Sequence, residues 1–189
     1  MKAINLSIFI VSILYSVEFN VYPYLQNASP HSMNILWETD SDSQSIVEWG
    51  EYVFLSETTI GLSFSNYGSS KIHTVELVNL EPNTRYYYRV ILGDYESYSD
   101  LYNFVTPPEP SSEASFRIVA MSDMQRDNSN PNKFNEMIHD GILDYIEEEY
   151  SNDIAVELAM VLTTGDLVDN GNSYSQWQNH FFEPAKDLF

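Results

Sequence analysis

The sequence contains no cysteine, so disulfide bonds, thiolate nucleophiles and thiolate metal sites are excluded. Basic residues are also scarce, because 8 Lys and Arg stand against 28 Asp and Glu and give a formal net charge of −20. Proteins bind nucleic acids and anionic membranes through basic patches. We therefore expect neither kind of surface on this protein. Apolar residues make up 43% of the chain and aromatic residues 14%, which is enough for folded cores.

A membrane-spanning helix needs roughly 20 consecutive apolar residues, and the amino-terminal apolar run is shorter than that. It covers residues 3–14 after Lys2 and has the length of a signal-peptide core. We predict a signal peptide over residues 1–16, cleaved after Ser16. The protein would then be secreted or periplasmic, with no membrane contact after cleavage. An uncleaved anchor and a buried strand are the alternatives for this run.

Helical periodicity is missing between residues 21 and 106, where short strand-like runs are separated by turn residues. Met33, Ile35 and Trp37 occupy alternate positions, as they do in a strand with one buried face. Several short strands with turn signals between them are typical of an all-β sandwich. We therefore predict a β-sandwich domain over residues 17–107.

One strand of this domain carries a more specific signal. A turn that contains leucine and proline, residues 80–83, leads into a run in which Tyr86, Tyr88 and Val90 share one face. The run resembles the tyrosine corner of fibronectin type III and immunoglobulin-like sandwiches, in which a tyrosine hydroxyl hydrogen-bonds to the backbone of the corner. We assign this role to Tyr86. A carbohydrate-binding platform is an alternative use of the tyrosines, but strand packing explains their spacing more simply.

The pattern changes after a proline- and serine-rich linker at residues 108–115. Residues 116–121 and 154–164 are predicted strands, and each is followed by a predicted helix. Such alternation is typical of a parallel sheet with crossover helices. We therefore predict the beginning of an α/β domain over residues 116–189.

Local signals place the starts of these two helices. Asn130 and Pro131 suit the cap and the first residue of one helix. Ser173 with Gln176, and Ser175 with Gln178, form two overlapping capping boxes that open the other helix. We expect Pro184 to interrupt this second helix.

Two aspartates follow the predicted strands of the α/β part. Asp123 closes the run at residues 116–122, and Asp166 closes the run at residues 159–165. In an open α/β sheet, ligands bind beyond the carboxyl ends of the strands, so two acids from neighbouring strands can share a metal ion. Gln125 is a third oxygen donor in the first loop, and Gly165 would let backbone and metal approach closely. The alternative is that the aspartates cap helices or form turns.

The next loop residues, Asp169 and Asn170, are read as turn formers rather than ligands.

These motifs resemble those of a known family. Ser-Asp-Met-Gln at residues 122–125, followed by Gly-Asp-Leu at 165–167, resembles the first two sequence blocks of calcineurin-like metallophosphoesterases. Residues 23–27, 32–39 and 47–50 resemble the fibronectin-like domain that precedes the catalytic domain in purple acid phosphatases. The implied fold is a fibronectin III-like β-sandwich followed by the first βαβα part of a metallophosphoesterase α/β sandwich.

The resemblance also implies a chemistry. Asp123 would bind the first metal ion and Asp166 would bridge two ions, which would be divalent or of mixed valence (Fe, Zn or Mn). A phosphate ester would be the substrate, and a metal-bound hydroxide would hydrolyse it. Later ligand blocks of the family are absent from the 189 residues, so this chain alone is expected to be an inactive fragment. An extracellular binding module with a non-catalytic α/β scaffold is the alternative.

The chain departs from the family pattern at two positions. Many relatives have histidine where this chain has Gln125, and purple acid phosphatases have an iron-binding tyrosine where it has Asp169. A purple tyrosinate-bound ferric site is therefore not expected, and the metal stays open. The four histidines are expected in the sandwich or on solvated helix faces and are not assigned as ligands; they are His31, His73, His139 and His180.

Overall fold

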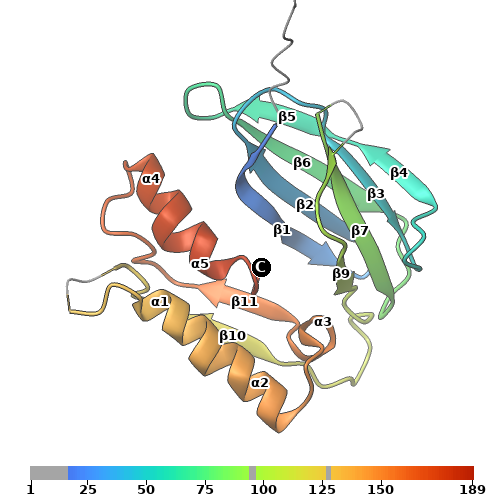
Figure 1. Cartoon of the computed structure of the whole chain (residues 1–189). Helices are drawn as coiled ribbons and strands as arrows, with labels where there is room; N and C mark the ends of the chain where they lie inside the picture. Colours follow the sequence, from blue (N-terminus) through green and yellow to red (C-terminus); the bar gives the residue numbers. More distant parts are fainter. Residues whose placement is uncertain (1–16, 94–96, 127–128) are drawn as a thin grey trace, which may run out of the picture.

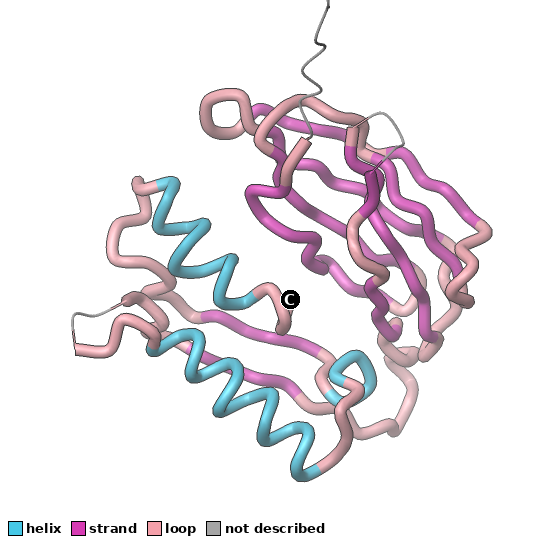
Figure 2. The backbone as a smooth tube through the Cα atoms, in the orientation of Figure 1, coloured by secondary structure: helices cyan, strands magenta, loops and turns pink. Residues whose placement is uncertain are grey.

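The computed structural model describes residues 17–93, 97–126 and 129–189. The predicted signal peptide, residues 1–16, lies outside them. The chain folds into a β-sandwich followed by a smaller α/β part (Figure 1). Figure 2 shows that the helices belong to the second part. No helix of the described ranges is long and apolar enough to cross a membrane.

Two antiparallel sheets form the sandwich. The first contains, in spatial order, β1 (Phe19–Ser29), β2 (Ser32–Thr39), β6 (Lys71–Val78) and β5 (Leu62–Ser65). The second contains, in spatial order, β4 (Glu57–Ile60), β3 (Ile46–Gly50), β7 (Arg85–Leu92) and β8 (Ser97–Tyr98), and β9 (Tyr102–Val105) also pairs with β7. The predicted sandwich is therefore confirmed.

The core between the sheets follows the alternation of the sequence. Met33, Ile35 and Trp37 on β2 are buried, as are Tyr86 and Tyr88 on β7. Each large apolar side chain buried in this way contributes about 1.5–3 kcal/mol relative to exposure. Burial on alternate positions is thus what holds the two sheets together.

The tyrosine corner forms as predicted. The hydroxyl of Tyr86 accepts a hydrogen bond of 2.9 Å from the backbone N–H of Glu81. The same corner is closed by Thr106, whose hydroxyl donates to the carbonyl of Glu81 at 2.6 Å and accepts from the N–H of Thr84 at 2.9 Å. Residues 107–117 contain neither helix nor strand. The exact linker boundaries, 108–115, stay a prediction.

The α/β part contains one parallel strand pair, β10 (Ile118–Met121) and β11 (Met160–Thr163). A long helical run precedes β11 and a second one follows it. The first consists of α1 (Lys133–Glu136), the π-helical segment η1 (Met137–Leu143) and α2 (Asp144–Glu149). The second consists of α4 (Tyr174–Gln176), the π-helical segment η2 (Trp177–Phe182) and α5 (Glu183–Ala185). The predicted β, helix, β, helix order is confirmed.

Both helical runs pack on the strands through one apolar cluster. Its buried members include Met121, Phe134, Ile138 and Phe181. Phe134 and Phe181 come from different runs and stack with ring centroids 5.7 Å apart. The small sheet is thus covered by helices through a single core, which sets the positions of the loops that follow its strands.

The sequence predictions were wrong at residues 154–157, which form the short helix α3 (Ile154–Glu157) and not the start of a strand. Two ion pairs lie at its ends, because Asp153 pairs with Arg85 at 2.6 Å and Glu157 pairs with Arg117 at 2.6 Å. Arg85 belongs to the sandwich, so this turn depends on a contact that local patterns do not contain.

The predicted starts of the helices also need correction. Asn130 is not the cap of the first helix, because its side chain accepts a hydrogen bond from the N–H of Asn132 in a turn and the helix begins at Lys133. Ser173 does precede the second helix, but its side chain makes no capping hydrogen bond. Its predicted partner, Gln176, instead accepts a bond from the N–H of Asn170 at 2.7 Å.

Two further expectations for this second helix fail. Pro184 does not interrupt it, because it is the second residue of the final segment α5 (Glu183–Ala185), and a missing N–H is tolerated in the first turn of such a segment. The second predicted capping box, Ser175 with Gln178, does not start the helix, because Ser175 lies within α4.

Candidate metal centre

The candidate centre is built from the two loops that follow β10 and β11. Backbone pairing continues beyond the strands, since the N–H of Thr164 donates to the carbonyl of Met121 at 3.1 Å. The N–H of Asp123 then donates to Gly165 at 3.3 Å, and the N–H of Gln125 donates to Asp166 at 2.9 Å. The structure therefore brings the two predicted loops side by side, with Asp123 next to Gly165 and Asp166.

Both aspartates have an uncommon backbone conformation. The φ angle is 59° at Asp123 and 50° at Asp166, which places both in the left-handed region. No other non-glycine residue in the described part of residues 116–189 has a positive φ. This conformation costs an L-residue about 1–2 kcal/mol, and such residues concentrate at functional sites. Both side chains are exposed, so their oxygens are available to a ligand from solvent.

Gly165 is required by its conformation. Its φ angle is 132°, a value that L side chains rarely adopt. A Cβ atom at this position would meet no protein atom within 4 Å. Glycine is thus selected here by backbone conformation, immediately before Asp166, and the close approach of a metal ion to Gly165 stays a prediction.

Gln125 is partly buried, and its side-chain oxygen Oε1 is buried without a hydrogen-bond partner among the described residues. A buried amide oxygen without a partner destabilises the fold, because its hydrogen bonds to water have been lost and not replaced. Ligation of a cation would recover that loss, because hard divalent cations prefer oxygen ligands. This orphaned oxygen and the two exposed carboxylates fit part of a metal centre. Their ligation of a metal stays a prediction.

The described residues do not supply a fuller ligand set. They contain no group of three or more His, Asp or Glu side chains placed to hold one metal ion. His73 belongs to the sandwich core and His31 pairs with Glu109 at 3.0 Å. His139 and His180 are half-buried on the helices, and Nδ1 of His180 is buried without a partner among the described residues. The expectation that His180 lies on a solvated helix face is therefore wrong for its Nδ1 atom.

The turn role expected for the loop after Asp166 is present at Asn170. The carbonyl of Asn170 accepts from the N–H of Ser173 at 2.9 Å, and its side chain accepts from the N–H of Asn172 at 3.1 Å. This turn directs the chain toward the sandwich. There Tyr174, the first residue of α4, donates a hydrogen bond of 2.6 Å to Glu38 of β2.

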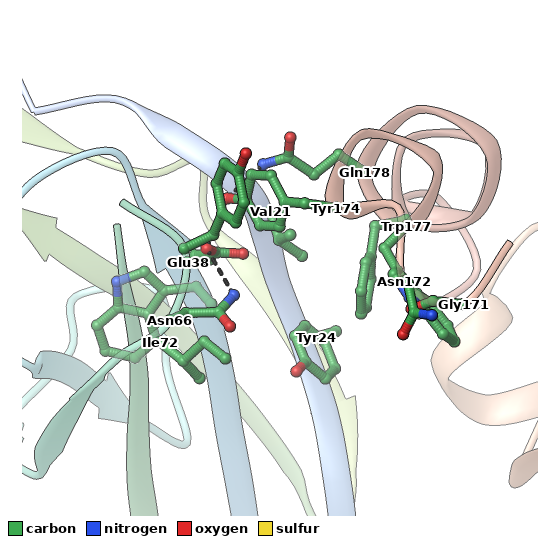
Figure 3. A pocket seen from close by; sticks show the side chains of 13 residues that line it. Val21, Tyr24, Glu38, Asn66, Ile72, Gly171, Asn172, Tyr174, Trp177 and Gln178 are labelled. Carbon is green, nitrogen blue, oxygen red and sulfur yellow. Dashed lines mark hydrogen bonds between the residues drawn. The ribbon is translucent and has the colours of Figure 1, made fainter. Parts of the chain in front are cut away.

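The sequence predictions did not identify this contact. Glu38 is only 4% exposed because the second helical run covers it. Tyr174 lies 136 positions away in the chain, so no local signal could have identified the pair. The contact borders a pocket between the sandwich and the α/β part (Figure 3).

Comparison with known proteins agrees with both parts of the fold. Residues 19–106 match the family described as purple acid phosphatase, N-terminal domain. This segment is therefore a purple acid phosphatase N-terminal domain. Purple acid phosphatase 1 of Ipomoea batatas is 30% identical over 155 residues, which are 77% of this chain and 28% of that protein.

Solved structures extend the likeness of fold to the second part of the chain. A purple acid phosphatase from yellow lupin (Lupinus luteus) seeds matches 89% of this chain with a TM-score of 0.53 and 20% identity. The structure of PhoD matches 83% of the chain with a TM-score of 0.52 and 15% identity. The chain spans 40% of the lupin protein and 29% of PhoD. At these identities the two structures show a shared fold alone, and the phosphatase family is supported by the domain match at residues 19–106 and by the relative from Ipomoea batatas.

Proposed function

We propose that this purple acid phosphatase N-terminal domain and the α/β part that follows it belong to a metal-dependent phosphoesterase. The observation that carries the proposal is the pair of left-handed aspartates, Asp123 and Asp166, on loops that are hydrogen-bonded to each other. They follow neighbouring parallel strands, where ligands bind in α/β sheets. The similarity to Purple acid phosphatase 1 supports the same class of reaction.

Each residue of the centre has a proposed role. By the resemblance to metallophosphoesterases, Asp123 would bind one cation and Asp166 would bridge two. A carboxylate can bridge because its two oxygens offer about four lone-pair sites. The amide oxygen of Gln125 would be a neutral ligand. Bound cations would polarise the phosphoryl oxygens and lower the pKa of a water molecule near the phosphorus. The proposed metal ions are iron, zinc or manganese.

The charge of the protein gives these cations a second role. A net charge of −20 repels an anionic phosphate ester. Two exposed aspartates in the centre add to this repulsion unless cations neutralise them. Metal binding would therefore come before productive binding of the substrate, and we propose an obligatory order of that kind.

We further propose that the 189-residue chain does not hydrolyse phosphate esters by itself. Its described residues offer two carboxylates and one amide to the centre, whereas a two-metal site needs several ligands for each ion. We also propose export of the protein, on the apolar run at residues 3–14.

A manganese titration tests the metal centre. The electron paramagnetic resonance signal of free Mn²⁺ measures how tightly the chain binds the ion. The affinity should fall by about tenfold or more in Asp123→Asn and in Asp166→Asn, because each variant removes one charged ligand. Asp169→Asn is the matched control, because Asp169 is exposed in the same loop and is read as a turn former. Equal Mn²⁺ affinity in all four proteins would contradict the proposed ligands.

An enzyme assay tests the second part of the proposal. With an aryl phosphate and added Mn²⁺, Zn²⁺ or Fe²⁺, the chain should give no more hydrolysis than the metal alone. Strong turnover that is lost in Asp166→Asn would support the phosphoesterase and refute the inactivity of the isolated chain. Strong turnover that persists in both asparagine variants would refute the assigned centre.

A further inference from the structure

A pocket of about 350 Å³ lies between the sandwich and the second helical run (Figure 3). Strands β1, β2 and β6 supply one wall, and the loop before α4 supplies Gly171 and Asn172 to the opposite side. Tyr174 and Trp177 of the second helical run lie on that side as well. The pocket therefore exists only when the two parts of the chain are docked, and its outer wall begins five residues after Asp166.

The buried carboxylate of Glu38 faces this pocket. Three neutral groups donate to its oxygen Oε1: the amide of Asn66 at 2.9 Å, the hydroxyl of Ser70 at 2.5 Å and the hydroxyl of Tyr174 at 2.6 Å. No basic residue in the part of the chain that the structure describes forms an ion pair with Glu38. Charged groups that are buried to this extent are generally paired. The Glu38 carboxyl group is therefore hydrogen-bonded to neutral donors and has no cationic partner among the described residues.

Aromatic rings make up much of the remaining lining. Tyr67 and Tyr174 stack with ring centroids 4.4 Å apart, and Tyr24 and Phe182 meet at 5.3 Å. Trp177 contributes a further ring. The ring faces of such residues attract cations, with the strongest effect where the cation has lost its water.

The hydroxyl of Tyr174 does not neutralise the carboxylate by giving up its proton. Burial, followed by the hydrogen bond to Glu38, raises the pKa of Tyr174 to about 12. Burial and the charge of Glu38 also raise the pKa of Tyr24. Both tyrosines are therefore neutral near pH 7, and the charge of Glu38 remains for a ligand to balance.

We propose that this pocket binds a small organic cation, of the quaternary or tertiary ammonium class, with Glu38 as its counter-ion and the aromatic rings as its walls. An anionic ligand is disfavoured because the lining contains no Lys, Arg or His. A bare metal ion is disfavoured because Glu38 supplies the one carboxylate of the lining and its oxygen Oε1 already accepts three hydrogen bonds. A neutral sugar would stack on the rings but would leave the charge of Glu38 unbalanced. A poorly hydrated ammonium ion satisfies both features of the pocket.

The test compares choline with its neutral isostere, 3,3-dimethyl-1-butanol, by isothermal titration calorimetry on the 189-residue chain. Choline should bind at least tenfold more tightly than the isostere, a difference of about 1.4 kcal/mol. The affinity of choline should fall by about tenfold in Glu38→Gln, which keeps an acceptor for the three donors and removes the charge. Glu76→Gln is the matched control, because Glu76 is an exposed residue of β6 and does not line the pocket.

A second variant tests the pocket without a substitution at the buried residue Glu38, which could unfold the protein. Tyr67 is 64% exposed, so Tyr67→Ala should keep the fold, as judged by circular dichroism, and weaken choline binding about fivefold. The proposal is overturned if choline and its isostere bind equally, if a neutral sugar such as methyl glucoside binds more tightly than choline, or if choline does not bind at millimolar concentrations. It is overturned as well if Glu38→Gln binds choline like the parent chain. None of these outcomes bears on the Mn²⁺ titration of the metal centre.

Discussion

The buried histidine of the sandwich makes the stability of this protein sensitive to mild acid. His73 on β6 is fully buried between the sheets and stacks on Trp37 with ring centroids 4.9 Å apart. Its two ring nitrogens contact the hydroxyls of Thr39 at 2.7 Å and Ser45 at 2.9 Å. Both partners are neutral, so no charged group is in direct contact with the ring.

Burial lowers the pKa of His73 to about 4. Among the charged groups around it, Asp42 and Glu38 oppose this shift, and Lys71 adds to it. In the unfolded chain, the pKa of histidine is about 6.5. Between these two values the unfolded state binds a proton that the folded state does not bind, so the free energy of unfolding falls as the pH falls.

The size of the effect follows from the difference between the two pKa values. Each pH unit within the window costs about 1.4 kcal/mol, because one proton separates the two states. The contribution of His73 is complete above pH 6.5 and is lost as the pH falls toward 4. Between pH 7 and pH 5 the loss is about 2 kcal/mol, and over the whole window it is about 3 kcal/mol.

Urea unfolding at pH 7, 6, 5 and 4.5 measures this loss if it is compared with His73→Gln. The many carboxylates titrate in both proteins, so their effect cancels in the difference. The parent chain should be the more stable protein at pH 7, and its advantage should shrink by about 2 kcal/mol at pH 5. As an independent check, the ring protons of His73 should show no NMR titration above pH 5. Unfolding free energies that stay parallel within about 0.5 kcal/mol, or a histidine that titrates near pH 6.5, would refute the reasoning.

Three further predictions concern single positions. Tyr86→Phe leaves the N–H of Glu81 without its partner and should lower the free energy of unfolding by about 1–2 kcal/mol in urea; an unchanged midpoint would argue against the corner. Gly165→Ala places a Cβ on a backbone with a φ of 132° and should lower the melting temperature, with a cost of about 1 kcal/mol or more; an unaffected melting temperature would contradict the strain. Asp166→Gly removes the cost of the left-handed conformation, so it should raise the free energy of unfolding by up to about 1 kcal/mol while weakening Mn²⁺ binding. A fall in both the free energy of unfolding and the Mn²⁺ affinity would contradict this prediction.

Patterns with a short range in the sequence predicted much of this fold. Alternation identified the buried residues of β2, and the leucine and proline turn identified the hydrogen bond of Tyr86. These signals suffice because the period of a strand or helix decides which residues share one face, and the apolar face is the one that becomes buried.

Contacts between the two parts of the chain were beyond such patterns. Residues 154–157 read as a strand, yet they form a helix whose preceding residue, Asp153, pairs with Arg85 of the sandwich. Glu38 occupies a polar position of an alternating strand, yet Tyr174 and its helix bury it. In both cases a residue far away in the chain decides the outcome, and tertiary contacts override local preference.

The candidate metal centre depends both on a short-range pattern and on contacts between distant residues. The end of a strand is a local feature, and it placed Asp123 and Asp166 at the same edge of the small sheet. Their left-handed conformation is not local, because the hydrogen bonds from Asp123 to Gly165 and from Gln125 to Asp166 join loops from different strands. A conformation that costs free energy persists only where the surrounding structure holds it in place. The paired loops supply that constraint before any cation arrives, so metal binding would select among few arrangements of the carboxylates and would lose little entropy in ordering them.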